Sequence, residues 1–165
     1  ESDAVGTDFL GQVCLKWEAA ANQFKDLNIP VTILRTGVVL SKTGGALEKM
    51  RTPIVSPLGS GNQYLAWIHI DDLCNLYIKA VEEDFEGVYN TVSPESHTNR
   101  TFSKTLAKAI KRPYLPIAVP GLLLKLVFGE LAIILLEGSR LSSGKIEKKG
   151  FVFKYIELKR ALESL

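Results

Sequence analysis

Asn62, Gln63 and His69 are the residues whose types and spacing best suit contact with a substrate. The amides of Asn62 and Gln63 follow a Gly-Ser-Gly turn and can both donate and accept hydrogen bonds. The imidazole of His69 lies in a mostly apolar run, where it serves either as a general base or as a hydrogen-bonded structural residue. We predict a substrate-binding role for these three residues. His97 lies in a polar loop, where we expect an exposed side chain.

Asp71 and Asp72 follow the same run and offer two carboxylates. Paired carboxylates can act as acid and base, but adjacent residues at a helix start do not converge on one point. Aspartate at such a place more often caps the free N–H groups, and we expect that role here. The cysteines, Cys14 and Cys74, lack the spacing of a metal or redox motif, so we expect buried free thiols and no metal site.

Two β-branched segments, residues 31–36 and 87–92, predict strands of a parallel sheet. Residues 31–36 are rich in β-branched side chains and bounded by Pro30 and Gly37, and we expect both strands to be buried on both faces, as in a parallel sheet. Residues 64–70 favour a further short extended segment. Helical periodicity surrounds these segments, and we expect helices over residues 7–26, 44–52, 71–83, 98–111, 120–128, 130–137, 142–149 and 156–164.

The strand count indicates an α/β fold that further strands must complete. A parallel sheet of two strands leaves apolar faces uncovered. The sequence begins at Glu1, and its single methionine is Met50, so we expect a missing upstream segment. Arg35 ends the first strand, and we expect it to pair with an acid such as Glu18, because a buried guanidinium needs a partner.

Three stretches resemble, in the same order, segments of one protein family. They are KWEAA at 16–20 followed by TILRTGVVL at 32–40, then GGALEKM at 44–50, then PLGSGNQ at 57–63 followed by WIHIDDL at 67–73. This order resembles the NAD-dependent epimerase/dehydratase family of atypical short-chain dehydrogenases/reductases, the epimerase family proteins. Residues 87–94 and 112–113 fit the same pattern, so the resemblance covers nearly the whole chain.

The resemblance implies the C-terminal portion of a Rossmann-like parallel sheet at residues 1–112. A small, mostly helical C-terminal domain of unknown function would follow at residues 113–165, and the N-terminal dinucleotide-binding half would be missing. The family implies NAD or NADP as cofactor of the full-length protein and no cofactor for this fragment. In the family, the turn that matches Thr36, Gly37 and Val38 approaches the nicotinamide, so we predict cofactor binding there.

The Gly59-Ser60-Gly61 segment is not the phosphate loop of the family, because it precedes an extended segment and Tyr64 stands where a third glycine would be. It either borders a substrate cleft or forms an ordinary tight turn.

The Tyr/Lys catalytic pair of the family has no counterpart at the matching positions. With Glu18 as the reference, Leu10 stands at the tyrosine position and Cys14 at the lysine position. Lys16 lies about 200° round the helix from Cys14 and faces elsewhere. The arginine that meets a diphosphate in sugar-nucleotide enzymes is matched by Leu65. The catalytic residues are therefore unknown from the sequence.

Two functions fit these observations. The first is an NAD(P)-dependent nucleotide-sugar epimerase/dehydratase-like oxidoreductase, in which this chain supplies the substrate side of the cleft and is inactive alone. The second is a non-catalytic NAD(P)-binding sensor or regulatory protein on the same fold, which the missing Tyr/Lys pair favours.

The charge balance predicts the class of partner. Lys and Arg number 20 and Asp and Glu 18, and this net charge of +2 argues against a nucleic-acid-binding protein. Residues 115–136 are apolar but interrupted by prolines, a glycine and charges, which argues against a membrane span. We expect a cytoplasmic protein whose partners are a small-molecule substrate, its missing N-terminal segment and, through exposed apolar faces, a second copy.

Overall fold

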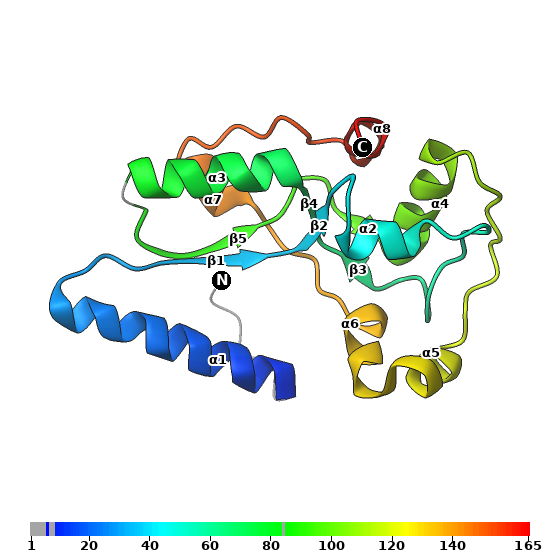
Figure 1. Ribbon diagram of the computed structural model, residues 1–165, viewed down its shortest axis with the longest axis horizontal. Coiled ribbons are helices and arrows are strands. Elements are labelled where there is room, and N and C mark those ends of the chain that lie inside the picture. The colour runs from blue at the N-terminus through cyan, green and yellow to red at the C-terminus, as the bar shows by residue number, and fades with distance from the viewer. Residues whose placement is uncertain (1–5, 7–8, 84) are drawn as a thin grey trace.

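The computed structural model describes residue 6, residues 9–83 and residues 85–165 (Figure 1). The elements in chain order are α1 Phe9–Asn22, η1 Gln23–Leu27, β1 Thr32–Thr36, β2 Val38–Leu40, α2 Gly45–Met50, β3 Tyr64–Leu65, β4 Trp67–His69, α3 Ile70–Glu82, β5 Gly87–Thr91, β6 His97–Thr98, α4 Asn99–Ala109, α5 Gly121–Phe128, η2 Gly129–Ala132, α6 Ile133–Leu136, α7 Gly144–Lys148 and α8 Leu158–Glu163. The fold is α/β, as the sequence predicts.

Parallel pairing joins the strands that position the candidate site. β1 pairs with β5 in parallel, with Thr32 opposite Gly87 and Thr36 opposite Thr91. β2 continues from β1 after Gly37 and pairs in parallel with β4. The predicted strands at 31–36 and 87–92 are thereby confirmed. β3 pairs antiparallel with β6, so the extended segment at 64–70 divides between two partners.

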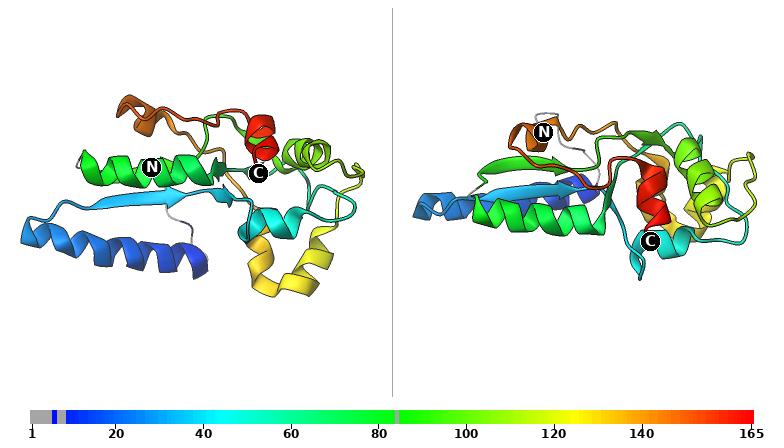
Figure 2. Two further views of the ribbon diagram at one scale, coloured as in Figure 1. Left: turned by 45° about the horizontal axis from the view of Figure 1, so that its top comes forward. Right: turned by 90° about the horizontal axis from the view of Figure 1, so that it is seen from above.

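Helices α1 and α3 lie on opposite sides of the β1–β5 pair (Figures 1 and 2). The Arg35 guanidinium at the end of β1 fixes α1, because it donates hydrogen bonds of 2.7 Å and 2.8 Å to the two carboxylate oxygens of Glu18. This bidentate pair confirms the predicted partner of Arg35. The hydrogen bond from Arg35 and its charge hold the pKa of Glu18 below its ordinary value, against a smaller opposing effect of burial.

Two clusters of buried side chains form the core. One gathers side chains from β4, α3, β5 and the segment that follows α7, including Ile68, Leu76, Tyr89 and Phe153. The other packs α4 against the C-terminal helix α8 and includes Phe102 and Leu158. Side chains from before and after residue 112 therefore share both clusters. The division into domains at residue 112 stays a prediction.

The two cysteines differ from the sequence expectation, because Cys14 and Cys74 are both exposed free thiols. On α3, the residues that face the core are Asp72, Leu76 and Ala80. Cys74 lies two positions from Asp72, about 200° round the helix, and so points to solvent. α1 has no buried residue at all, and its apolar stripe is uncovered by the described part of the chain. None of the described helices is long and apolar enough to cross a membrane.

Candidate functional site

A hollow that is open to solvent lies where the parallel strands end. β1 and β5 run in the same direction and finish together at Thr36 and Thr91. The hollow begins immediately after β5 and is lined by Tyr64, Leu65, Ala66, Val92, Ser93, Glu95, Ser96, His97, Ser139, Arg140 and Leu141. Open parallel sheets bind their ligands at the carboxyl ends of the strands. This hollow is therefore the candidate site.

The Thr36–Gly37–Val38 turn packs against the floor of the hollow. The Gly37 N–H donates to Thr91 O at 3.3 Å, and the Val38 N–H donates to Ala66 O at 2.8 Å. A Cβ on Gly37 would lie 2.8 Å from Ala66 O and 3.0 Å from Val92 Cγ1, so only glycine fits here. Ala66 and Val92 both line the hollow. The structure places the predicted cofactor turn at this edge, and its contact with NAD(P) stays a prediction.

The predicted substrate residues Asn62 and Gln63 lie just before the hollow without lining it. The Gln63 amide nitrogen donates to Leu58 O and to Leu135 O, both at 2.9 Å. Its amide oxygen accepts a 3.1 Å hydrogen bond from Ser60 Oγ. Gln63 thus ties this loop to α6, whereas the Asn62 side chain is exposed. A substrate role for either residue stays a prediction.

Gly59 and Gly61 form a tight turn, one of the two alternatives that the sequence leaves open. The Gly61 N–H donates to Leu58 O at 2.9 Å, and both glycines have positive φ angles, 58° and 74°. Arg100 braces the turn by donating to Ser60 O at 3.3 Å. The segment is held by contacts within the chain and carries no strand-to-helix phosphate loop.

His69 is buried, with 2% of its surface exposed, and its ring is surrounded by the chain itself. Nδ1 accepts the Asp71 N–H at 3.0 Å, Nε2 lies 3.3 Å from Ser164 Oγ, and the ring stacks on Tyr155 at 3.8 Å. Burial lowers the pKa of His69, although Asp71 and Asp72 raise it in part. These contacts support the hydrogen-bonded structural alternative, and substrate contact by His69 stays a prediction.

Asp72 has a different role from the predicted helix cap. His69 is the N-cap of α3, because its side chain accepts the Asp71 N–H. The Asp72 carboxylate is 1% exposed and accepts the backbone N–H groups of Lys154 at 2.8 Å and Tyr155 at 2.9 Å. The capping expectation is wrong because Asp72 faces the C-terminal segment, on the same side of α3 as the core residues.

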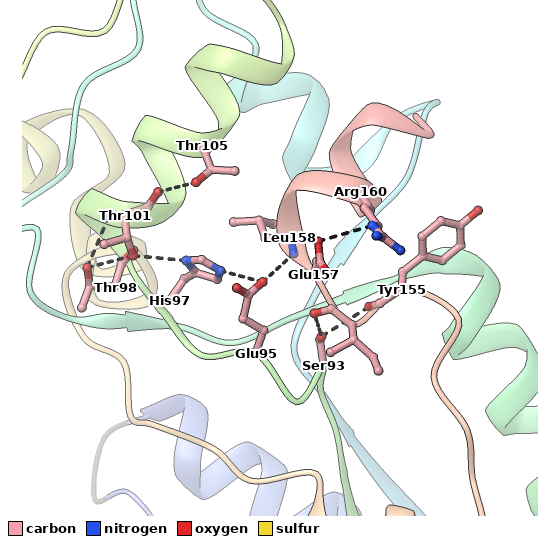
Figure 3. Close-up of polar contacts among 11 residues, drawn as sticks. Ser93, Glu95, His97, Thr98, Thr101, Thr105, Tyr155, Glu157, Leu158 and Arg160 are labelled. Carbon is pink, nitrogen blue, oxygen red and sulfur yellow. Dashed lines mark hydrogen bonds and ion pairs between the residues drawn. The ribbon is translucent and has the colours of Figure 1, made fainter.

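His97 and Glu95 form a pair that the sequence analysis missed (Figure 3). His97 Nε2 lies 3.0 Å from Glu95 Oε2, and the His97 side chain is 14% exposed, so the expectation of an exposed His97 is wrong. Nε2 has no well-aligned hydrogen bond among the described residues, and the nearby carboxylate is an ion-pair contact. Glu95 Oε2 also accepts the Leu158 N–H at 2.6 Å. The i, i+2 spacing next to an extended segment was the signal for this pair, because such residues share a face.

The environment of Glu95 favours its ionised form. Burial is the largest single effect and raises the pKa of Glu95. The contact with His97, the hydrogen bond from the Leu158 N–H and the charge of His97 together lower it by more, so the pKa of Glu95 lies below its ordinary value. Glu95 therefore binds the start of α8 as a carboxylate at neutral pH.

Comparison of sequences shows which proteins the chain resembles. Residues 119–165 match the model of a domain of unknown function, DUF1731. An epimerase family protein of Staphylococcus aureus strain MRSA252 is 38% identical over 163 residues, which are 96% of this chain and 54% of that protein. The chain thus resembles the C-terminal part of an epimerase family protein of the atypical short-chain dehydrogenase type. It spans about half the length of the curated relatives it matches, and an epimerase family protein of Staphylococcus epidermidis is 37% identical over the same share.

Solved structures agree with this family and show which part of the fold the chain forms. The human epimerase family protein SDR39U1, isoform 2, crystallised with NADPH, matches with a TM-score of 0.89 and 35% identity over 99% of this chain and 57% of that one. A nucleoside-diphosphate sugar epimerase from Corynebacterium glutamicum matches with a TM-score of 0.74 and 27% identity over 98% of this chain and 31% of that one. The chain described here forms the C-terminal part of this Rossmann-like fold.

Proposed function

We propose that this chain supplies the substrate side of a cleft in an NAD(P)-dependent oxidoreductase or epimerase-like enzyme. The observation that carries the proposal is the hollow at the carboxyl edge of β1 and β5, bordered by the Gly37 turn. Ligands of open parallel sheets bind at this edge. A small-molecule substrate that enters the hollow would therefore lie beside the turn that the family resemblance assigns to the nicotinamide.

The Thr36–Val38 turn would offer a nicotinamide only a few free polar groups. The N–H groups of Gly37 and Val38 are already bonded within the chain, so the turn would meet the ring through carbonyl oxygens and side-chain atoms. The Thr36 hydroxyl accepts a 2.9 Å hydrogen bond from Thr91 Oγ1, which fixes its orientation. NAD(P)H, when bound, would supply a hydride. The chain's own residues would orient the ring and the substrate.

The chain by itself is expected to bind the dinucleotide poorly. Dinucleotide sites hold the pyrophosphate with a glycine-rich turn at a helix N-terminus. Among the described residues, the Gly59–Gly61 turn is the glycine-rich segment that invites comparison, and it is occupied by Arg100. We infer that the pyrophosphate binds outside these residues and that the isolated chain is inactive.

A second function, a non-catalytic NAD(P)-binding sensor on the same fold, is favoured by one specific observation. Leu10 and Cys14 lie on α1 at the positions where the family resemblance places the tyrosine and the lysine. Leucine has no titratable group, and a thiol cannot anchor a ribose as a cation does. The sensor would therefore bind a ligand at the carboxyl edge of the strands without proton transfer by the Leu10 and Cys14 positions of α1.

Cofactor binding and turnover together test the proposed function. The experiment titrates NADPH and NADH, by fluorescence, into the 165-residue chain and into a fusion with the dinucleotide-binding half of the human relative. We expect saturation at roughly micromolar cofactor for the fusion and none at roughly millimolar cofactor for the chain alone. Saturable binding by the chain alone at micromolar cofactor would contradict the proposal that the pyrophosphate binds outside these residues.

Turnover separates the two functions. The fusion is incubated with NADPH and a panel of small carbonyl compounds, and loss of the reduced cofactor is followed. Cofactor oxidation that depends on a carbonyl compound supports the oxidoreductase and removes the sensor. Tight NADPH binding without turnover of any compound supports the sensor.

A further inference from the structure

We propose that Arg140 is the anchor for an anionic group of the substrate, a phosphate or a carboxylate, in the hollow at the strand ends. The proposal rests on the proposed function in one respect, that this hollow takes the substrate. It adds the charge of the ligand and the residue that recognises it. The described residues that line the hollow carry two formal charges besides the histidine, on Arg140 and on Glu95.

The backbone around Arg140 is fixed on both sides. The Gly138 carbonyl accepts the Tyr64 N–H at 3.3 Å, and a Cβ at Gly138 would overlap Tyr64 O, so this segment must run directly against β3. On the other side, Asn90 Nδ2 donates to Ser142 O at 3.4 Å, which ties the segment to β5. Arg140 lies between these two attachments and is held at the wall of the hollow. A fixed backbone lowers the entropy lost when the side chain binds a ligand.

The guanidinium of Arg140 is available, whereas the hollow's carboxylate is engaged. Arg140 is exposed, and it forms no ion pair with any residue of the described ranges. Glu95 lies in the same hollow, but its Oε2 accepts the Leu158 N–H and faces His97. Arginine binds phosphate and carboxylate through paired parallel hydrogen bonds. The free cation therefore favours an anionic ligand.

The remaining polar residues of the hollow narrow the ligand class. Tyr64, Ser96 and Ser139 line the hollow beside Arg140, and their hydroxyl groups are of the kind that donates to anion oxygens. This combination suits the anionic end of a small substrate, with the rest of the molecule extending along the strand ends toward Gly37.

Anion titrations on the 165-residue chain test this assignment without any cofactor. Inorganic pyrophosphate and succinate are titrated separately and followed by backbone amide chemical shifts. We expect saturable shifts at residues around the hollow with at least one probe. Arg140→Gln is expected to weaken that binding roughly 10- to 100-fold, because it removes charge-assisted hydrogen bonds. Arg140→Lys keeps the charge and loses the planar fork, so its affinity should fall between the two.

Arg112→Gln is the matched control, because the substitution removes the same charge. Arg112 is also exposed, but it does not line the hollow. It should bind the probes as the unchanged chain does. Equal affinities of the Arg140→Gln and Arg112→Gln variants, or no saturation by either probe at about 10 mM, would overturn the proposal. Binding of pyrophosphate alone identifies a phosphate site, and binding of succinate alone identifies a carboxylate site. The anion titration needs no NADPH. Its result therefore does not depend on whether the cofactor experiment succeeds or fails.

Discussion

At the scale of single residues, the adjacent aspartates Asp71 and Asp72 differ in burial and in the groups that they bind. Asp72 is buried and accepts two backbone N–H groups of the C-terminal segment. The Asp71 side chain is 47% exposed and pairs with the Lys154 ammonium at 3.3 Å. The Lys154 pKa is raised above its ordinary value by its contacts with Tyr155 and then with Asp71. The two carboxylates therefore allow a matched test of burial against exposure.

Asp72→Ala should destabilise the protein far more than Asp71→Ala. Removing the buried acceptor leaves the N–H groups of Lys154 and Tyr155 without a partner, at a cost of about 2–5 kcal/mol in the free energy of unfolding. Removing the exposed ion pair should cost about 0–1 kcal/mol. Urea denaturation of both variants measures the difference. Equal losses would mean that Asp72 does not hold the C-terminal segment.

At the scale of elements, Glu95 connects the loop after β5 to the start of α8 (Figure 3). Ser93 adds a second attachment, because its hydroxyl donates to Ile156 O at 3.0 Å. Together with Asp72, these residues hold the segment from Lys154 to α8 against the carboxyl edge of the strands. The position of α8 should therefore depend on the ionisation of Glu95.

Acidification should remove the contribution of Glu95 to stability. The pKa of Glu95 is lower in the folded protein than its ordinary value, so its contribution is present in full above the ordinary value. It is lost as the pH falls through the folded value, below the ordinary pKa of about 4.3. Because the side chain is 40% exposed, solvent screening limits the effect to about 1 kcal/mol.

Unfolding free energies of the unchanged protein and of Glu95→Gln, measured from about pH 7 down to about pH 3, check this dependence. The two curves should differ at neutral pH and converge in acid. Glu157→Gln is the control, because it removes a carboxylate beside α8 that pairs only with Arg160 among the described residues. A constant gap between the Glu95→Gln and unchanged curves would contradict the assigned role.

At the scale of the whole molecule, several elements leave large apolar side chains exposed, among them α1, α3 and α5. Trp17 on α1 is 71% exposed, and Leu122 and Leu126 on α5 are 71% and 75% exposed. Clusters of this kind mark surfaces that bind other proteins or associate with one another. The β1–β5 pair is also only half-buried along β1, although its composition is that of a strand buried on both faces.

We predict that the isolated chain self-associates through α5. The double variant Leu122→Glu, Leu126→Glu should weaken association by about 100-fold or more, because each leucine contributes about 1.5–3 kcal/mol when buried. Sedimentation velocity across a range of concentrations measures the change. Val152→Glu serves as the control, since Val152 is 85% exposed but lies away from α5. A single monomeric species for the unchanged chain would contradict the prediction.

The sequence determined the features that depend on neighbours along the chain. The β-branched runs predicted β1 and β5, because such side chains favour extended backbone. Periodic apolar residues predicted the long helices α1, α3 and α4. Arg35 required an acid, and Glu18 lay on the helix that packs beside its strand. The ordered motifs also predicted the resemblance to the C-terminal part of epimerase family proteins, which the comparisons confirm.

The tertiary structure alone decided which distant groups meet. Asp72 and the Lys154 N–H are 82 residues apart, and Glu95 and the Leu158 N–H are 63 apart. The hollow likewise joins Tyr64, Glu95 and Arg140 from three separate segments. Short sequence windows carry information on backbone propensity and on the buried face of an element, not on the partner at the other end of a long loop. The contacts of Asp72 and Glu95 and the position of Arg140 beside the hollow therefore follow only from the return of the C-terminal segment to the strand ends.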